Sequence, residues 1–220
     1  MSNSFLNPVT TQTWANGRHI VRCVKVIQET WDVRTFCFMA DQPILFFFKP
    51  GQFVTLELEI DGQPIMRSYT ISSSPSVPYS FSVTIKRVPG GRVSNYLLDT
   101  LQPGMTLAAL PPQGQFHLPA QLPSALLLLS AGSGVTPMMA ITRTLRDLGL
   151  QTPVHFVYSA RHAGDLIFRD ELLALAAADP HFHLTLLLES LPDAPMPPNG
   201  AVLAAPVSGL FQLTIPARAS

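Results

Sequence analysis

The tetrapeptide Arg67–Thr70 combines the side chains that an anionic, aromatic ligand would need. It reads Arg-Ser-Tyr-Thr. A guanidinium can bind a phosphate through two hydrogen bonds, a phenol ring can stack on a flat heterocycle, and a hydroxyl can reach a ring nitrogen. The same side chains on a strand would also suit a plain cross-strand pair, with the arginine stem lying along its neighbour. The segment alone leaves both interpretations open.

Two glycine-containing turns offer places where backbone could approach a phosphate. Gly91–Ser94 opens a short helical segment, so Ser94 and the free N–H groups of that helix could hold an anion. Gly132–Pro137 reads Gly-Ser-Gly-Val-Thr-Pro and separates an apolar run from a helix, with Thr136 and Pro137 suited to the helix start. An ordinary helix cap would explain the first turn, and any α/β domain could contain the second.

Residue patterns for metal or hydrolytic catalysis are missing from the sequence. Its six histidines form no His-Glu-x-x-His arrangement. Cys23 and Cys37 are its only cysteines, too few for a four-cysteine zinc site or an iron–sulfur cluster. Ser133 lacks the first glycine of a nucleophile elbow, because Ala131 stands there. We therefore expect no metal site.

The segments that must position these residues change character partway along the chain. From His19 to Leu118, short alternating runs separated by turn residues predict a six-stranded antiparallel Greek-key barrel with one short helix at 92–100. From Pro123, continuous apolar runs alternate with helical segments. This pattern predicts a partial parallel α/β domain whose sheet is covered by helices on both faces. The fold class is therefore β plus α/β.

The last thirty residues break this pattern. They contain six prolines and only two charged residues, so we expect a tail that is mostly irregular and leaves the edge of the parallel sheet exposed. Only 201–205 and 210–215 are apolar enough to attempt a strand. The predicted parts are an N-terminal extension (1–18), the barrel (19–120), the α/β domain (123–190) and the tail (191–220).

Composition excludes several partners. With 14 basic and 14 acidic residues the chain has no net charge, and hence no general basic field to hold nucleic acid. Its apolar runs fall far short of the roughly 20 residues that cross a bilayer, and its polar start does not resemble a signal peptide. We expect a cytoplasmic protein that binds neither nucleic acid nor membrane.

The order of the three motifs resembles the ferredoxin–NADP reductase family of flavoproteins. Members carry Arg-x-Tyr-Thr in a barrel, Gly-x-x-Ser at the next helix and Gly-x-Gly-x-Thr-Pro in an α/β unit. Pro50–Phe53 and Pro112–Phe116 are also similar to turns of the family barrel. The resemblance extends over residues 19–190. Within the family, the stretches 67–74, 131–138 and 158–168 look most like the reductase of the hybrid-cluster protein, with phenol and benzoate dioxygenase-type reductases as close competitors.

The resemblance implies a role for each matching position. Arg67 would bind the flavin phosphate, Tyr69 would stack on the isoalloxazine, and Thr70 would lie near its reactive N5, with Ser68 beside them. Tyr69, Thr70 and Thr136 would be the residues at the reaction. The other implied flavin positions are Ile85 and Arg87 at the ribityl and adenosine part, and Gly91, Val93 and Ser94 at the pyrophosphate. The implied nicotinamide dinucleotide positions are Gly132, Gly134, Thr136, Ser159 and Arg161.

The implied cofactor is FAD, with FMN as runner-up, and the co-substrate is NADH or NADPH. Hydride would pass from nicotinamide to flavin, and single electrons would leave to an iron–sulfur acceptor such as the hybrid-cluster protein. Family members of this type have a later Cys-Gly-Pro segment, and hybrid-cluster reductases add a ferredoxin domain. No cysteine follows Cys37, so we expect a C-terminally incomplete member.

Three functions therefore stay open. The first is an NAD(P)H-dependent flavoprotein reductase. The second is a flavin-binding module with little or no NAD(P)H turnover, for which the missing nicotinamide half argues. The third is a ligand-carrying barrel of an unrelated kind, which would make the joint occurrence of all three motifs a coincidence.

Overall fold

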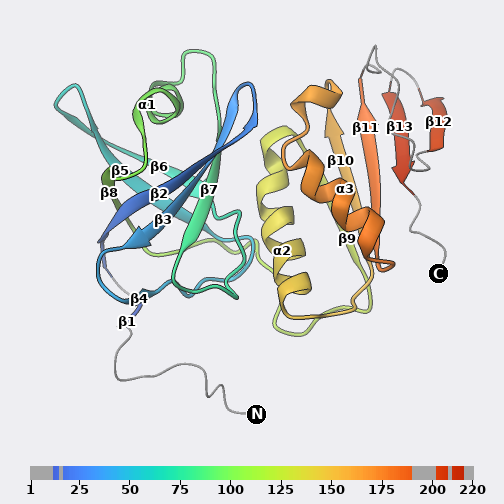
Figure 1. Ribbon diagram of the computed structural model, residues 1–220, viewed down its shortest axis with the longest axis horizontal. Coiled ribbons are helices and arrows are strands. Elements are labelled where there is room, and N and C mark those ends of the chain that lie inside the picture. Colours follow the sequence, from blue (N-terminus) through green and yellow to red (C-terminus); the bar gives the residue numbers. More distant parts are fainter. Residues whose placement is uncertain (1–11, 15–16, 190–201, 208–209, 216–220) are drawn as a thin grey trace.

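The computed structural model describes residues 12–14, 17–189, 202–207 and 210–215, which form two halves lying side by side (Figure 1). The first half contains β1 (Gln12–Thr13), β2 (His19–Thr30), β3 (Val33–Ala40), β4 (Ile44–Leu45), β5 (Phe53–Ile60), β6 (Gln63–Thr70), β7 (Phe81–Lys86), α1 (Arg92–Thr100) and β8 (Thr106–Ala109). The second contains β9 (Leu126–Ala131), η1 (Gly132–Gly134), α2 (Val135–Asp147), β10 (Val154–Ala160), η2 (Ala163–Asp165), α3 (Arg169–Ala178), β11 (Phe182–Leu188), β12 (Val202–Val207) and β13 (Leu210–Ile215).

The first half is the predicted six-stranded antiparallel sheet, in the order β6-β5-β8-β2-β3-β7. A single bridge between Ile71 and Val83 joins its two ends into a barrel. The predicted hairpin turn between β5 and β6 has positive φ at both central residues, 53° at Asp61 and 72° at Gly62, as a two-residue type I′ turn requires. Alternate residues of β5 point into the core, where Val54 is fully buried.

The second half contains the predicted parallel strands, β9, β10 and β11, paired in sequence order. The expectation that helices cover both faces of this sheet is wrong. Leu127 and Leu129 of β9 are 63% and 58% exposed, whereas Phe156 and Leu184, on the opposite face, are fully buried. Right-handed crossovers between strands that follow one another in the same direction place both helices on one face. Accordingly, α2 and α3 bury one face only.

The tail does not leave the edge of the parallel sheet exposed. Strand β13 pairs antiparallel with β11, and β12 pairs antiparallel with β13 and forms the outer edge (Figure 1). Pro206 is tolerated because it falls in that edge strand, where the register shifts between Ala204 and Val207. The expected irregularity of 190–201 and 216–220, and most of the N-terminal extension, lie outside the described residues. The predicted domain limits stay predictions.

Each half has its own core, and the two cores meet at one strand. The barrel core includes a cluster of aromatic rings formed by Trp14, Phe38, Phe46 and Phe81. Val33 of β3 is instead buried in the core of the second half. Helix α2 lies at the junction between barrel and parallel sheet (Figure 1). In the described part of the chain, every helix is too short or too polar to cross a membrane.

Candidate functional site

A cavity of about 660 Å³ lies between the barrel and the start of α2. The barrel side comes from the end of β6, the end of β7 with the following turn, and the first residues of α1. Ser133 and Thr136 line it from the second half. Ten of the sequence-predicted site residues meet there: Arg67, Ser68, Tyr69, Thr70, Ile85, Arg87, Gly91, Val93, Ser94 and Thr136.

The barrel opens beside β6 because that strand and β7 are bridged only at Ile71–Val83. All four residues of Arg67–Thr70 therefore reach the cavity, although they alternate between the two faces of the strand. The exposed Arg67 guanidinium donates a 3.0 Å hydrogen bond to the Met66 carbonyl, and no carboxylate within the described residues forms an ion pair with it. Burial raises the pKa of the half-buried Tyr69 phenol, so Tyr69 presents a neutral ring.

The start of α1 forms a close backbone cradle. A Cβ at Gly91 would lie 2.6 Å from the Ser94 hydroxyl and 2.8 Å from the Val88 Cβ, so this turn requires glycine. The Ser94 hydroxyl accepts a hydrogen bond from the Val88 amide (3.2 Å). No side chain caps the helix, and its first turn holds no acidic residue. The free N–H groups therefore suit an anion such as a phosphate.

Two of the cations on the barrel wall, Arg87 and Lys86, are already paired with carboxylates. Arg87 binds the Asp99 carboxylate through both terminal nitrogens (2.5 and 3.3 Å), and this pairing lowers the pKa of Asp99. Lys86 lies 3.3 Å from Asp32. Arg67 is thus the cation with the freest access to a bound phosphate among these three. The sequence interpretation missed Lys86 and Thr84, although their place beside Ile85 on β7 was a usable signal.

The glycine turn before α2 brings Thr136 to the cavity. The buried Thr136 hydroxyl donates to the Ser133 carbonyl (3.1 Å). Gly132 has a φ of 50°, and its carbonyl accepts a 3.1 Å hydrogen bond from the Tyr158 hydroxyl. That hydroxyl also accepts from the Ile167 amide (3.2 Å), and burial raises the pKa of Tyr158 to about 12. Tyr158, which the sequence did not indicate, therefore stabilises this turn through its hydroxyl.

Four predicted residues do not line this cavity. Gly132 and Gly134 shape the turn without forming the wall. Ser159 and Arg161 lie at and just beyond the end of β10, the strand beside β9. Arg161 pairs with the buried Asp165 carboxylate at 3.5 Å. The structure thus brings the predicted flavin positions together and places Ser159 and Arg161, two of the predicted nicotinamide dinucleotide positions, one strand away.

The cavity residues fit a ligand with both phosphate and ring parts. An exposed guanidinium and an uncapped helix start can bind phosphate, and Tyr69 can stack on a ring. The Gly91 cradle keeps the backbone accessible because a side chain there would collide with Ser94. Within the described ranges, no group of histidine, cysteine or acidic side chains could hold a metal ion.

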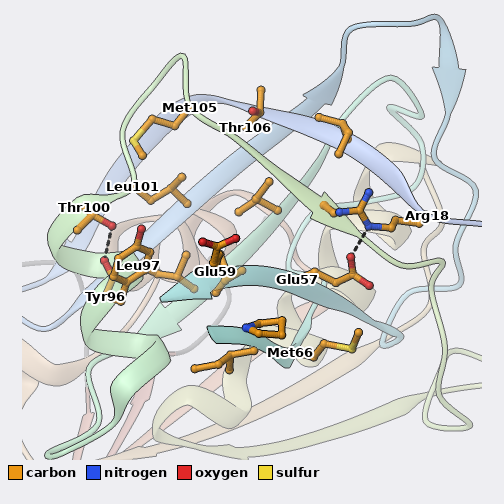
Figure 2. A pocket seen from close by; sticks show the side chains of 16 residues that line it. Arg18, Glu57, Glu59, Met66, Tyr96, Leu97, Thr100, Leu101, Met105 and Thr106 are labelled. Carbon is orange, nitrogen blue, oxygen red and sulfur yellow. Dashed lines mark hydrogen bonds and ion pairs between the residues drawn. The ribbon is translucent and has the colours of Figure 1, made fainter. Parts of the chain in front are cut away.

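A second cavity, of about 490 Å³, lies against the other end of α1 (Figure 2). Arg18 and Glu57 form an ion pair at one side of it, and Thr100 donates to the Tyr96 carbonyl (2.7 Å) at the other. It contains none of the predicted site residues. The candidate site is therefore the cavity between the halves.

Comparison with known protein families divides the chain in the same way as the structure. The oxidoreductase FAD-binding domain matches residues 20–118, and the oxidoreductase NAD-binding domain matches residues 128–205. These matches confirm the expected FAD and NAD(P)H binding domains.

Similar proteins point the same way. The reductase subunit of glycine betaine monooxygenase from Pseudomonas aeruginosa is 64% identical over 189 residues, which cover 86% of this chain and 52% of that protein. The stachydrine N-demethylase reductase subunit from Rhizobium meliloti is 39% identical over 164 residues, 74% of this chain and 46% of that protein. The chain spans about half the length of these curated relatives. The expectation that the chain is most similar to the reductase of the hybrid-cluster protein is therefore wrong. The similar proteins are reductase subunits of oxygenases.

A solved structure shares the arrangement of both halves. The flavohemoglobin from Malassezia yamatoensis with bound FAD and heme superposes with a TM-score of 0.68 at 27% identity, covering 79% of this chain and 46% of that chain.

Proposed function

We propose, starting from the finding that the chain belongs to the ferredoxin-reductase-type family of FAD- and NAD-binding oxidoreductases, that it is the electron-entry part of an oxygenase reductase. It would take electrons from NAD(P)H onto FAD and release them toward an oxygenase component. The observation that carries this proposal is the cavity shared by both halves, where Arg67–Thr70 faces Thr136.

On the barrel side, the residues would bind and orient FAD. Arg67 would hold a phosphate oxygen, and the uncapped start of α1 would hold the pyrophosphate through its N–H groups. Tyr69 would stack on the flavin ring, and Thr70 would lie at the ring edge. When bound, FAD supplies a ring that can accept a hydride and release electrons singly.

On the other side, the start of α2 would hold the nicotinamide. The Thr136 hydroxyl already donates to Ser133, which fixes the orientation of this turn. Hydride transfer needs no general acid or base, so the residues are asked chiefly to align two rings and exclude water. The cavity matches that demand, because its lining holds no histidine and no carboxylate.

The acceptor we propose is an oxygenase component of the glycine betaine monooxygenase type. Two similar proteins are the reductase subunits of glycine betaine monooxygenase and stachydrine N-demethylase. We prefer this acceptor to the hybrid-cluster protein, which is the alternative acceptor. A flavin-binding module with little turnover is the alternative function.

Flavin release and electron delivery test the proposal. The purified chain, reconstituted with FAD, should hold one FAD per chain after gel filtration and should release FAD rather than FMN on heating. With NADH or NADPH supplied anaerobically, it should reduce the oxygenase component of Pseudomonas aeruginosa glycine betaine monooxygenase faster than a hybrid-cluster protein. Retained FAD that neither nucleotide reduces would favour the binding module instead.

A further inference from the structure

One side chain of α2 crosses from the second half to the barrel. The Arg143 Nη1 donates a 2.6 Å hydrogen bond to the backbone carbonyl of Ser72. Ser72 is fully buried and lies two residues beyond Thr70, the last residue of β6, whose end lines the cavity. The contact therefore joins the helix on the nicotinamide side to the strand on the flavin side.

The other nitrogens of Arg143 are fixed within its own half. Its Nε and Nη2 donate to the two carboxylate oxygens of Glu171 on α3, at 2.9 and 2.5 Å. The guanidinium also lies 4.6 Å from the ring centre of Phe168. A planar fork held on two sides has little freedom left to move. The remaining nitrogen, Nη1, is therefore held in place against the Ser72 carbonyl. We call this rigid link between the halves the Arg143 strut.

Both ends of this strut connect directly to the cavity. Arg143 lies seven residues after Thr136 on one helix, which is about two turns and about 10 Å along its axis. On the barrel side, the Ser72 hydroxyl lies 2.9 Å from the Thr84 hydroxyl, and Thr84 lines the cavity. A shift at Arg143 would thus move Thr136 relative to Thr70.

Other polar contacts also join the halves, outside the cavity. The Phe168 amide donates a hydrogen bond to the Glu29 carboxylate, which the charge of Arg143 also attracts. Ser76 donates to Asp147 at 2.6 Å, at the far end of α2. The Trp31 indole donates to Asp165 at 3.3 Å. None of the residues in these contacts lines the cavity.

We propose that Arg143 is a positioning residue, which sets the spacing between the nicotinamide side and the flavin side of the cavity without touching either ring. The proposal rests on the proposed reductase function, because spacing matters only if hydride crosses the cavity. A displacement of about 1 Å between reacting groups can cost about 100-fold in rate.

Three variants of the FAD-reconstituted chain test it: Arg143→Met, Arg143→Lys and the control Arg146→Met. Arg146 is an exposed residue of the same helix, three residues further on. Stopped-flow reduction by NADH and by NADPH gives the limiting rate of flavin reduction separately from the dissociation constant of the nucleotide. Hydrogen exchange, followed by mass spectrometry without any nucleotide, reports the contact between the halves.

For Arg143→Met we expect a limiting rate about 10- to 100-fold below wild type, with unchanged FAD content and a nucleotide dissociation constant within about threefold. Exchange should rise only in segments 70–77 and 136–147. Arg143→Lys should recover part of the rate, because an ammonium can reach Ser72 or Glu171 but cannot form the fork. Arg146→Met should match wild type in every measurement.

Two results would overturn the proposal. One is a wild-type rate with wild-type exchange in Arg143→Met. The other is a slow variant whose exchange rises throughout both sheets, which would mean general destabilisation. If the wild-type chain binds FAD but neither nucleotide reduces it, the proposed function fails. Exchange then decides alone: a rise confined to the two segments supports the strut, and no rise refutes it.

Discussion

At the scale of single residues, the buried phenol of Tyr158 organises the turn that carries Thr136. Its hydroxyl joins the Gly132 carbonyl to the Ile167 amide, at 3.1 and 3.2 Å, and its side chain is fully buried. Removing the hydroxyl would leave the buried Ile167 amide and the part-buried Gly132 carbonyl without this partner. Such a loss costs about 1–3 kcal/mol.

We therefore expect Tyr158→Phe to lower the free energy of unfolding by about 1–3 kcal/mol, measured by urea denaturation. Tyr79→Phe is the matched control, because Tyr79 is 51% exposed and should change stability little. Equal stability of Tyr158→Phe and wild type would show that the turn does not depend on this hydroxyl.

The carboxyl of Glu29 makes the junction between the halves sensitive to pH. Burial raises its pKa above the ordinary value of 4.5, and the like charge of Glu171 adds to this. Hydrogen bonds from Thr35 and the Phe168 amide, and the positive charge of Arg143, act in the opposite direction. A raised pKa means that the folded chain keeps a proton that the unfolded chain releases. Glu29 therefore removes stability as pH rises from about 4.5 toward the higher folded-state pKa.

Glu29→Gln keeps a side-chain oxygen that can accept from Thr35 and removes the titration. Measured by urea denaturation, the free energy of unfolding of this variant should exceed that of wild type at about pH 7 and approach it at about pH 4. The opposite order at neutral pH would mean that the attraction to Arg143 outweighs burial.

Arg67 has the most direct predicted effect on flavin binding. Its guanidinium is exposed to the cavity and has no carboxylate partner within the described residues. Losing a charge-assisted contact of about 1.5–3 kcal/mol should weaken FAD binding by roughly 10- to 150-fold in Arg67→Ala. Fluorescence titration with FAD measures this, and Arg18→Ala, at the second cavity, should bind FAD as wild type does.

At the scale of elements, alternation and turn chemistry were sufficient to predict the barrel. The hairpin at Asp61–Gly62 and the apolar face of β5 follow from local sequence. Local sequence could not predict that helices cover only one face of the parallel sheet. A continuous apolar run such as 126–129 does not indicate which face is covered. In the tail, strands do form at the two apolar segments, 202–207 and 210–215, but the expectation of an exposed sheet edge is wrong because β13 pairs with β11. Pro206 is acceptable in β12 only because β12 is an edge strand.

The same reasoning separates what could be predicted of the site from what could not. Arg67–Thr70, Gly91–Ser94 and Thr136 were visible as local motifs, and the structure places them around one cavity. Arg143 and Tyr158 were not, because their importance lies in contacts with residues 71 and 26 positions away in the chain. No local pattern marks such contacts.

Strand β13 should be necessary for the stability of the second sheet. It has a neighbour on each side, β11 and β12, so a proline within it removes a ladder hydrogen bond. Leu213→Pro, at a position paired with Leu186, should speed hydrogen exchange of β11 and promote self-association through the freed edge. Ala205→Pro, within the register shift of edge strand β12, should have little effect. Unchanged exchange of β11 in Leu213→Pro would show that this pairing contributes nothing to stability.

At the scale of the whole molecule, the two halves together create the proposed site, since neither sheet alone lines the whole cavity. In the proposed function, the barrel would contribute the flavin side and the start of α2 the nicotinamide side. Helix α2 holds the two sides in register through Arg143. In the proposed function, electrons cross this cavity from NAD(P)H to FAD.

Anaerobic reduction of the FAD-reconstituted chain tests that claim most directly. The visible absorbance of the bound flavin is recorded before and after one equivalent of NADH, and separately of NADPH. At least one nucleotide should bleach the flavin of the wild-type chain, and the flavin of Arg143→Met should bleach more slowly at the same FAD content. Flavin that stays bound and fully oxidised in the presence of both nucleotides would contradict the proposed function.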